Sequence, residues 1–360
     1  MQTQQRPNIR GNSNQSMQPD ASGSETLRLG GLKIRYGYMC QSGKLPAGDP
    51  RIDKQKNKDW YCAVKNFSDQ KSDAFFAVCD GHGDHGDKCA KYAADRLPRR
   101  LAKITKTERK SSASKDLSEE QIYAACTQAY KECNEAMHNK HCKDFNVDIS
   151  GTTAISAYIQ GRLKRLTVSN VGDSRAVLGR KNITDDFHVA VPLSWDQNPY
   201  RGGERKRIRE AGGRILSTDQ MDGLAPIRVD ENDDYRDLIE GETEETDLRV
   251  WRKNERSPGT AFTRSLGDIY AEELGVIADP EMVTRELEEG DEIIVLASDG
   301  VFEFLTNQSV IDICAKYMNE DPLKACETVI SHSRGYWNEN EPYIDDMTMI
   351  CIFIESDALK

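Results

Sequence analysis

The sequence predicts an α+β fold, an α-β-β-α sandwich in which two antiparallel β-sheets pack together and pairs of helices flank them. Two observations favour this architecture. Short apolar runs bounded by Gly and Asp are typical of buried strands. Helical patterns come in pairs between groups of strands, whereas a doubly wound parallel sheet alternates single strands with single helices. The 360 residues, 37% of them hydrophobic, suffice for one large domain.

The predicted strands are short apolar runs distributed along the whole domain. They cover residues 74–79, 152–158, 166–171, 175–179, 291–298 and 347–354. The runs that end at 79 and 298 each lead directly into an Asp-Gly pair, and such a pair favours a turn at the end of a strand.

Helical patterns lie between these strands, over residues 86–104, 118–139, 204–211, 307–317 and 321–334. Ser118 and Gln121 have the spacing of a capping box, which satisfies free N–H groups where a helix begins. Gly212 and Gly213 follow the third helix and indicate its end.

The domain boundaries follow from composition. Residues 1–27 are rich in Gln, Asn, Ser and Gly and have few large apolar side chains, so we expect a disordered polar tail. Residues 28–356 should form a single domain. Within it, the segment at about 221–254 is acidic and poorly periodic, which predicts a surface flap near the active site.

Charge and composition limit the partners of this protein. A net charge of −11 disfavours binding to nucleic acid or to anionic membranes. The sequence contains no apolar run of about 18 residues, so we predict no membrane span. Its ten cysteines form no Cys-x-x-Cys pair, which indicates reduced thiols and a cytoplasmic protein. The basic run 201–214 leaves a nuclear location as the alternative, although an amphipathic helix with a solvated basic face is the favoured explanation of this run. We expect a monomer.

The first candidate site follows the strand 74–79. Asp80 lies at the strand end, and Gly81 lets the backbone approach closely enough for its carbonyl oxygen to act as a ligand. His82 comes next, and an imidazole suits proton transfer near neutral pH. A carboxylate and a carbonyl oxygen suit a hard cation such as Mg²⁺ or Mn²⁺.

Further acidic residues recur at the ends of other predicted strands. Asp299 repeats the arrangement of Asp80, and Asp345, Asp148 and Asp59 adjoin other strands. Each alone is an ordinary turn residue, but a sheet brings strand ends together. Carboxylates in one cleft would disfavour each other's ionised forms unless cations lie between them. Two metals about 3.5–4 Å apart are the usual arrangement, and they also generate a hydroxide nucleophile.

Several motifs, taken together and in order, resemble one family. The chain carries FAVCDGHG, DISGTTA, SNVGDSRAVLG, PGTAFTRSLGD, VLASDGVFEFL and DDMTMI in the order found in type 2C protein phosphatases, and the match covers roughly residues 34–354. No P-loop, Gly-x-Ser-x-Gly or Cys-x5-Arg motif points to another class of hydrolase. The resemblance implies hydrolysis of phosphoserine and phosphothreonine in proteins by direct attack of a hydroxide that bridges two Mg²⁺ or Mn²⁺ ions.

The resemblance also implies residue roles. Asp80 would bridge the metals beside the Gly81 carbonyl, and Asp299 and Asp345 would hold the first metal. His82 would protonate the leaving oxygen. Asp148 resembles the ligand of a third, weaker metal. Asp173 and Asp268, which lie in the motifs GDSR and SLGD, are interpreted as structural residues.

Three positions depart from the family pattern. Many members have Glu or Gln where this chain has Lys58, and a protonated Lys cannot ligate a metal. Either Asp59 and waters complete that shell, or the second metal binds more weakly. The family often has a phosphate-binding Arg before this point. Lys44, Arg51 and Lys54 are the candidates here, and Arg51 is favoured because Arg can bind phosphate bidentately. Glu303 stands where many members have Asp. The alternative to an active enzyme is a catalytically impaired scaffold that binds signalling partners.

Overall fold

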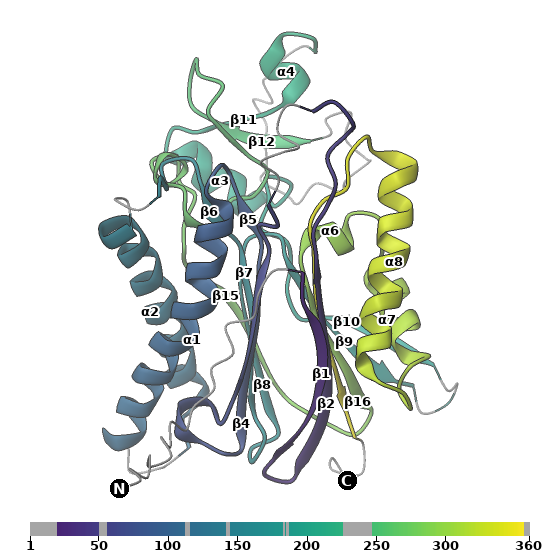
Figure 1. The fold of residues 1–360 in the computed structure, drawn as a ribbon. Helices are drawn as coiled ribbons and strands as arrows, with labels where there is room; N and C mark the ends of the chain where they lie inside the picture. The colour runs from purple at the N-terminus through teal and green to yellow at the C-terminus, as the bar shows by residue number, and fades with distance from the viewer. Residues whose placement is uncertain are drawn as a thin grey trace, which may run out of the picture.

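The computed structural model describes residues 20–49, 56–111, 116–141, 145–182, 184, 187–225 and 247–355. Two large antiparallel sheets face each other, and helices cover both outer faces (Figure 1). The six-stranded sheet has the order β1-β2-β17-β16-β9-β10. Its strands are β1 (Ser22–Leu29), β2 (Leu32–Gln41), β9 (Arg175–Lys181), β10 (His188–Pro192), β16 (Asp291–Ala297) and β17 (Met347–Ile354).

The five-stranded sheet has the order β15-β8-β7-β4-β3, and all its neighbouring strands are antiparallel. Its strands are β3 (Trp60–Lys65), β4 (Asp73–Cys79), β7 (Ala154–Gln160), β8 (Arg165–Val171) and β15 (Glu281–Glu286).

Strand β4 shows why these apolar runs lie at the centre of the sandwich. All its residues are buried. Because side chains alternate across a strand, Phe75 and Ala77 pack towards the helices, whereas Phe76 and Val78 pack towards the opposite sheet. A strand that is covered on both faces therefore reads as a continuous apolar run.

Helices form the two outer layers. Helices α1 (Gly86–Ser111) and α2 (Glu119–Ala136) cover the five-stranded sheet, and α6 (Asp299–Phe302), α7 (Asn307–Ala315) and α8 (Pro322–Asn340) cover the six-stranded sheet. The capping box of Ser118 and Gln121 is confirmed, since both of its hydrogen bonds form. The predicted sandwich of two antiparallel sheets flanked by helices is thus confirmed.

Small elements lie above the sandwich in Figure 1. One three-stranded sheet contains β11 (Arg214–Ser217), β12 (Leu248–Trp251) and β13 (Pro258–Thr260), and the other contains β5 (Gly81–His82), β6 (Gly151–Thr152) and β14 (Leu266–Gly267). The short helices are α3 (Gly202–Glu210), α4 (Thr218–Asp222) and α5 (Ile269–Glu272), and a π-helical turn covers Met137–His141. At the opposite end of the sandwich, a 3₁₀ turn at Phe67–Asp69 lies between β3 and β4.

One predicted boundary was wrong. Residues 22–27 belong to β1, which pairs with β2 along its full length, so the polar tail cannot extend to residue 27. The strand was missed because only Leu27 and Leu29 of β1 are buried and the rest of it is polar. The predicted flap at 221–254 contains the end of α4 and all of β12. Residues 226–246 of that segment lie outside the described residues, as do residues 1–19 of the predicted tail.

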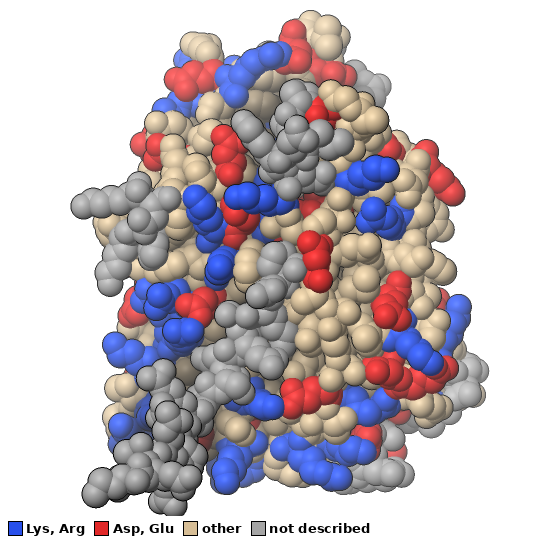
Figure 2. Space-filling model, in the orientation of Figure 1, with Lys and Arg blue, Asp and Glu red and all other residues tan. Residues whose placement is uncertain are grey.

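The surface agrees with the charged composition. On the face shown in Figure 2, acidic and basic side chains are interspersed. No helix among the described residues is both long and apolar enough to cross a membrane.

Candidate active site

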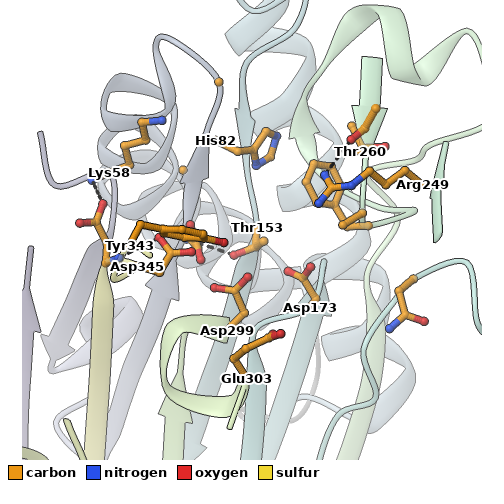
Figure 3. Close-up of a pocket in the computed structure, with 18 of the residues that line it drawn as sticks. Lys58, His82, Thr153, Asp173, Arg249, Thr260, Asp299, Glu303, Tyr343 and Asp345 are labelled. Carbon is orange, nitrogen blue, oxygen red and sulfur yellow. Dashed lines mark hydrogen bonds between the residues drawn. The ribbon is translucent and has the colours of Figure 1, made fainter. Parts of the chain in front are cut away.

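Strand ends bring acidic residues to one edge of the sandwich. Asp80 follows β4 and Asp59 precedes β3, and these two strands are neighbours in one sheet. Asp299 follows β16, and Asp345 lies just before β17, the neighbour of β16 in the other sheet. Asp80, Asp299 and Asp345 line one pocket, in which Figure 3 labels Asp299 and Asp345. Asp59 is fully buried and does not line it.

The same pocket receives Asp173, which follows β8 and lies next to Asp299 in Figure 3. The sequence analysis interpreted this residue as structural, and Asp-Ser in a turn offers little to distinguish a site residue. The sequence signal that could have identified Asp173 as a site residue was its position just after the end of a strand. Glu303 lines the pocket as well, one helical turn after Asp299.

Burial and neighbouring charges raise the pKa values of the carboxyl groups in the pocket. Burial raises the pKa of Asp80 well above its ordinary value, and the charges of Asp59 and Asp299 raise it further. Burial raises the pKa of Asp345 to about 8, again with a contribution from Asp299. Burial and Asp299 likewise raise the pKa of Asp173. Desolvation and like charges act in the same direction here, so a positive charge would stabilise the ionised cluster.

The donor chemistry of this cluster fits divalent cations. Asp59 Oδ1 and Asp299 Oδ1 are buried and have no hydrogen-bond partner among the described residues. An unsatisfied buried carboxylate oxygen is costly unless a cation or water binds it, and carboxylates are the ligands that Mg²⁺ and Mn²⁺ prefer. However, no three His, Cys, Asp or Glu side chains of the described chain converge in the geometry of a metal site. The residues therefore fit a metal by chemistry, and the individual ligands remain predictions.

The Asp80-Gly81 turn is held tightly in place. The Asp80 N–H donates to Thr153 Oγ1 at 3.0 Å, and the Asp80 carbonyl accepts from the Thr153 N–H at 2.8 Å. A Cβ atom on Gly81 would lie 2.1 Å from the Gly86 carbonyl oxygen and 2.8 Å from that of Lys58. Only glycine permits this approach. The role of the Gly81 carbonyl oxygen as a metal ligand stays a prediction.

His82 projects into the pocket above the carboxylates (Figure 3). Its Nε2 lies 2.5 Å from Oδ2 of Asp268, and its ring centroid lies 4.3 Å from that of Phe262. The carboxylate and the aromatic ring together hold the imidazole in one orientation. Asp268 is buried and was interpreted from sequence as structural. Its contact with His82 links positions that are 186 residues apart, so no local pattern could have revealed it.

Not every predicted site residue reaches the pocket. Ile149 lines it, but Asp148 does not: the Asp148 N–H donates to Asn146 Oδ1, and the Asp148 carbonyl accepts from the Tyr270 N–H. Arg51 lies outside the described residues. Lys58, which directly precedes Asp59 in the sequence, lines the pocket beside Asp345.

Comparisons with known proteins identify the family. The family model for protein phosphatase 2C matches residues 51–341. Probable protein phosphatase 2C 35 of Arabidopsis thaliana is 36% identical over 322 residues, covering 89% of this chain and 84% of that protein. Probable protein phosphatase 2C 75 of Oryza sativa subsp. japonica is 29% identical and covers 84% and 70%.

A solved structure, that of serine-threonine phosphatase 2C from Toxoplasma gondii, has the same fold with a TM-score of 0.67 at 16% identity, covering 94% of this chain and all of that one. A C. elegans sex determining protein gives a TM-score of 0.59 at 19% identity, covering 94% of this chain and 65% of that one. From the matched family model and the curated relatives, the chain belongs to the protein phosphatase 2C family of metal-dependent serine/threonine phosphatases.

Proposed function

We propose that the pocket hydrolyses phosphoserine and phosphothreonine with two Mg²⁺ or Mn²⁺ ions held by Asp80, the Gly81 carbonyl, Asp299, Asp345 and Asp59. Asp148 would contribute to a third, weaker site. The observation that supports this most is the group of buried carboxylates with unsatisfied oxygens at the meeting point of four strands. When bound, such cations lower the pKa of water towards neutrality and offset the charge of the phosphoryl group.

The protein side chains supply positioning and proton transfer. As an imidazolium, His82 would donate its Nδ1 proton, the one that Asp268 does not hold, to the oxygen of the leaving serine or threonine, because an alkoxide is a poor leaving group at neutral pH. Asp268 accepts a hydrogen bond from Nε2 in this structure, which favours the tautomer or ion that carries the proton there. The Thr153 hydrogen bonds keep Asp80 at the strand end. Arg51 stays a candidate for binding the phosphate.

The test is hydrolysis of a phosphothreonine peptide by the purified protein. We expect activity with Mn²⁺ or Mg²⁺ and none after addition of EDTA. Asp80→Asn should abolish turnover and leave the circular dichroism spectrum unchanged. Near-normal rates in that variant would rule out the metal assignment. Complete inactivity of the wild type at every metal concentration would favour the alternative, an impaired phosphatase-like scaffold.

The remaining expectations concern partners and location. The net charge of −11 and the interspersed surface charges of Figure 2 argue against nucleic acid as a partner. Phosphoproteins are the expected substrates because of the family. We infer a monomeric protein of the cytoplasm, with the nucleus as the alternative. Gel filtration and imaging of a tagged chain test these two statements directly.

A further inference from the structure

The basic side chains that line the pocket differ in whether they have an acidic partner among the described residues. Four of them line it, namely Lys56, Lys58, Arg175 and Arg249. Three have acidic partners: Lys56 pairs with Asp87 at 3.5 Å, Arg175 with Asp196 at 2.7 Å and Arg249 with Asp247 at 2.8 Å. The Lys58 ammonium makes no ion pair or hydrogen bond to any described residue. Its positive charge is thus available to a ligand.

The backbone of Lys58 is fixed next to the catalytic turn. Its N–H donates to Asp346 Oδ2 at 2.7 Å, and Asp346 Oδ1 accepts from the Gly43 N–H at the same distance. Its carbonyl oxygen packs against Gly81 so closely that no Cβ would fit there. The side chain therefore starts from a rigid base, and in Figure 3 it extends above the carboxylates, on the side where His82 lies.

An ammonium at this place has two electrostatic consequences. It is close enough to lower the pKa of Asp345 and Asp346, although burial raises both values overall. The same charge would repel a cation that approaches from its side, and it would attract a dianionic phosphoryl group. Lys is a common phosphate ligand because its three N–H donors adapt to the position of the oxygens.

We propose that Lys58 binds a non-reacting phosphoryl oxygen of the substrate and so positions the phosphoryl group over the carboxylate cluster. This rests on the proposed phosphatase function and adds a residue to it. A protonated Lys58 cannot ligate a metal, as the Glu of many family members would, but it can bind the phosphoryl group of the substrate. Phosphorylated peptides and free inorganic phosphate should both depend on this contact, because both present the same oxygens.

The experiment compares Lys58→Met, Lys58→Arg and Lys56→Met with the wild type. Met keeps the length of the chain but removes the charge, and Lys56 is a matched pocket lysine whose charge is already paired with Asp87. We expect Lys58→Met to raise both the KM for a phosphothreonine peptide and the Ki of inorganic phosphate about tenfold, the effect of losing one charged hydrogen bond. Lys58→Arg and Lys56→Met should stay within about twofold.

A second measurement separates substrate binding from metal binding. Calorimetric titration with Mn²⁺, without substrate, reports metal affinity alone. If Lys58→Met tightens Mn²⁺ binding and leaves KM and Ki unchanged, Lys58 acts only on the metal and the proposal is wrong. If the wild type proves inactive, the phosphatase mechanism fails, and calorimetric titration of the Mn²⁺-loaded protein with inorganic phosphate still decides the matter: equal affinities of wild type and Lys58→Met would overturn the role of Lys58.

Discussion

Replacement of Glu204 tests how the loop beside His82 is held. Glu204 lies on α3 and is 3% exposed. It accepts two hydrogen bonds from Arg207 at 2.8 and 2.6 Å, one from Arg264 Nη2 at 2.8 Å and one from Thr263 Oγ1 at 2.6 Å. Thr263 and Arg264 directly follow Phe262, the ring against which His82 packs. Glu204→Gln keeps the shape of the side chain and removes its charge.

The magnitude follows from the pKa of Glu204. Burial alone would raise this pKa, but the hydrogen bonds from Arg207 and Arg264 outweigh it and lower the value from 4.5 to about 2. One pKa unit corresponds to about 1.4 kcal/mol. The ionised group therefore contributes about 3 kcal/mol to the free energy of unfolding at neutral pH, and Glu204→Gln should lose about that amount.

The pH dependence has a definite sign. A carboxyl group with a lowered pKa in the folded state stabilises the protein above its unfolded value of 4.5, and this contribution is lost as the pH falls towards 2. The difference between wild type and variant should be constant above about pH 5.5 and shrink to about 2 kcal/mol near pH 3.5.

Urea denaturation at several pH values measures this difference. Glu210→Gln is the control, because Glu210 lies on the same helix in an exposed ion pair with Lys206 at 4.0 Å. We expect a change below about 0.5 kcal/mol for this control. A loss below about 1 kcal/mol for Glu204→Gln at pH 7, or a loss of equal size at pH 7 and pH 3.5, would refute the reasoning.

Three further predictions concern the metal site, the glycine turn and the acid. Burial and mutual repulsion raise the pKa values of Asp80, Asp173 and Asp345, so without metal the cluster destabilises the fold as the pH rises from about 4 to 8. The gain in Tm on adding Mn²⁺ should therefore be larger at pH 8 than at pH 5.5. Equal gains at the two pH values would contradict this reasoning. Gly81→Ala should lower Tm and abolish activity because its Cβ would lie 2.1 Å from a carbonyl oxygen, whereas Gly203→Ala, with no atom within 4 Å, should leave both nearly unchanged. His82→Ala should slow cleavage of a phosphothreonine peptide by about 10² or more and of an aryl phosphate much less, since a phenolate needs no proton; equal losses would exclude His82 as the acid.

Local patterns were enough to predict the most apolar strands of the sandwich and its long helices, but β2, β3, β10 and β15 were not predicted. A run such as 347–354 is apolar at every position but Thr348 because both faces of β17 are buried, and that property is visible without a structure. The capping box at Ser118 involves residues three apart, so spacing alone revealed it. By contrast, β1 is mostly polar, and its strand conformation depends on pairing with β2.

For the site, the sequence by itself determined that Asp80 and Asp299 stand at strand ends, because an apolar run followed by Asp-Gly is a local signal, and that Asp345 lies just before the last apolar run. The tertiary structure alone decided that Asp173 joins them, that Asp268 holds His82, and that Lys58 has an unpaired charge among the described residues. These facts depend on contacts between positions far apart in the chain. A sequence shows which groups are available, but the distances that determine their charges and partners arise only when the two sheets close on each other.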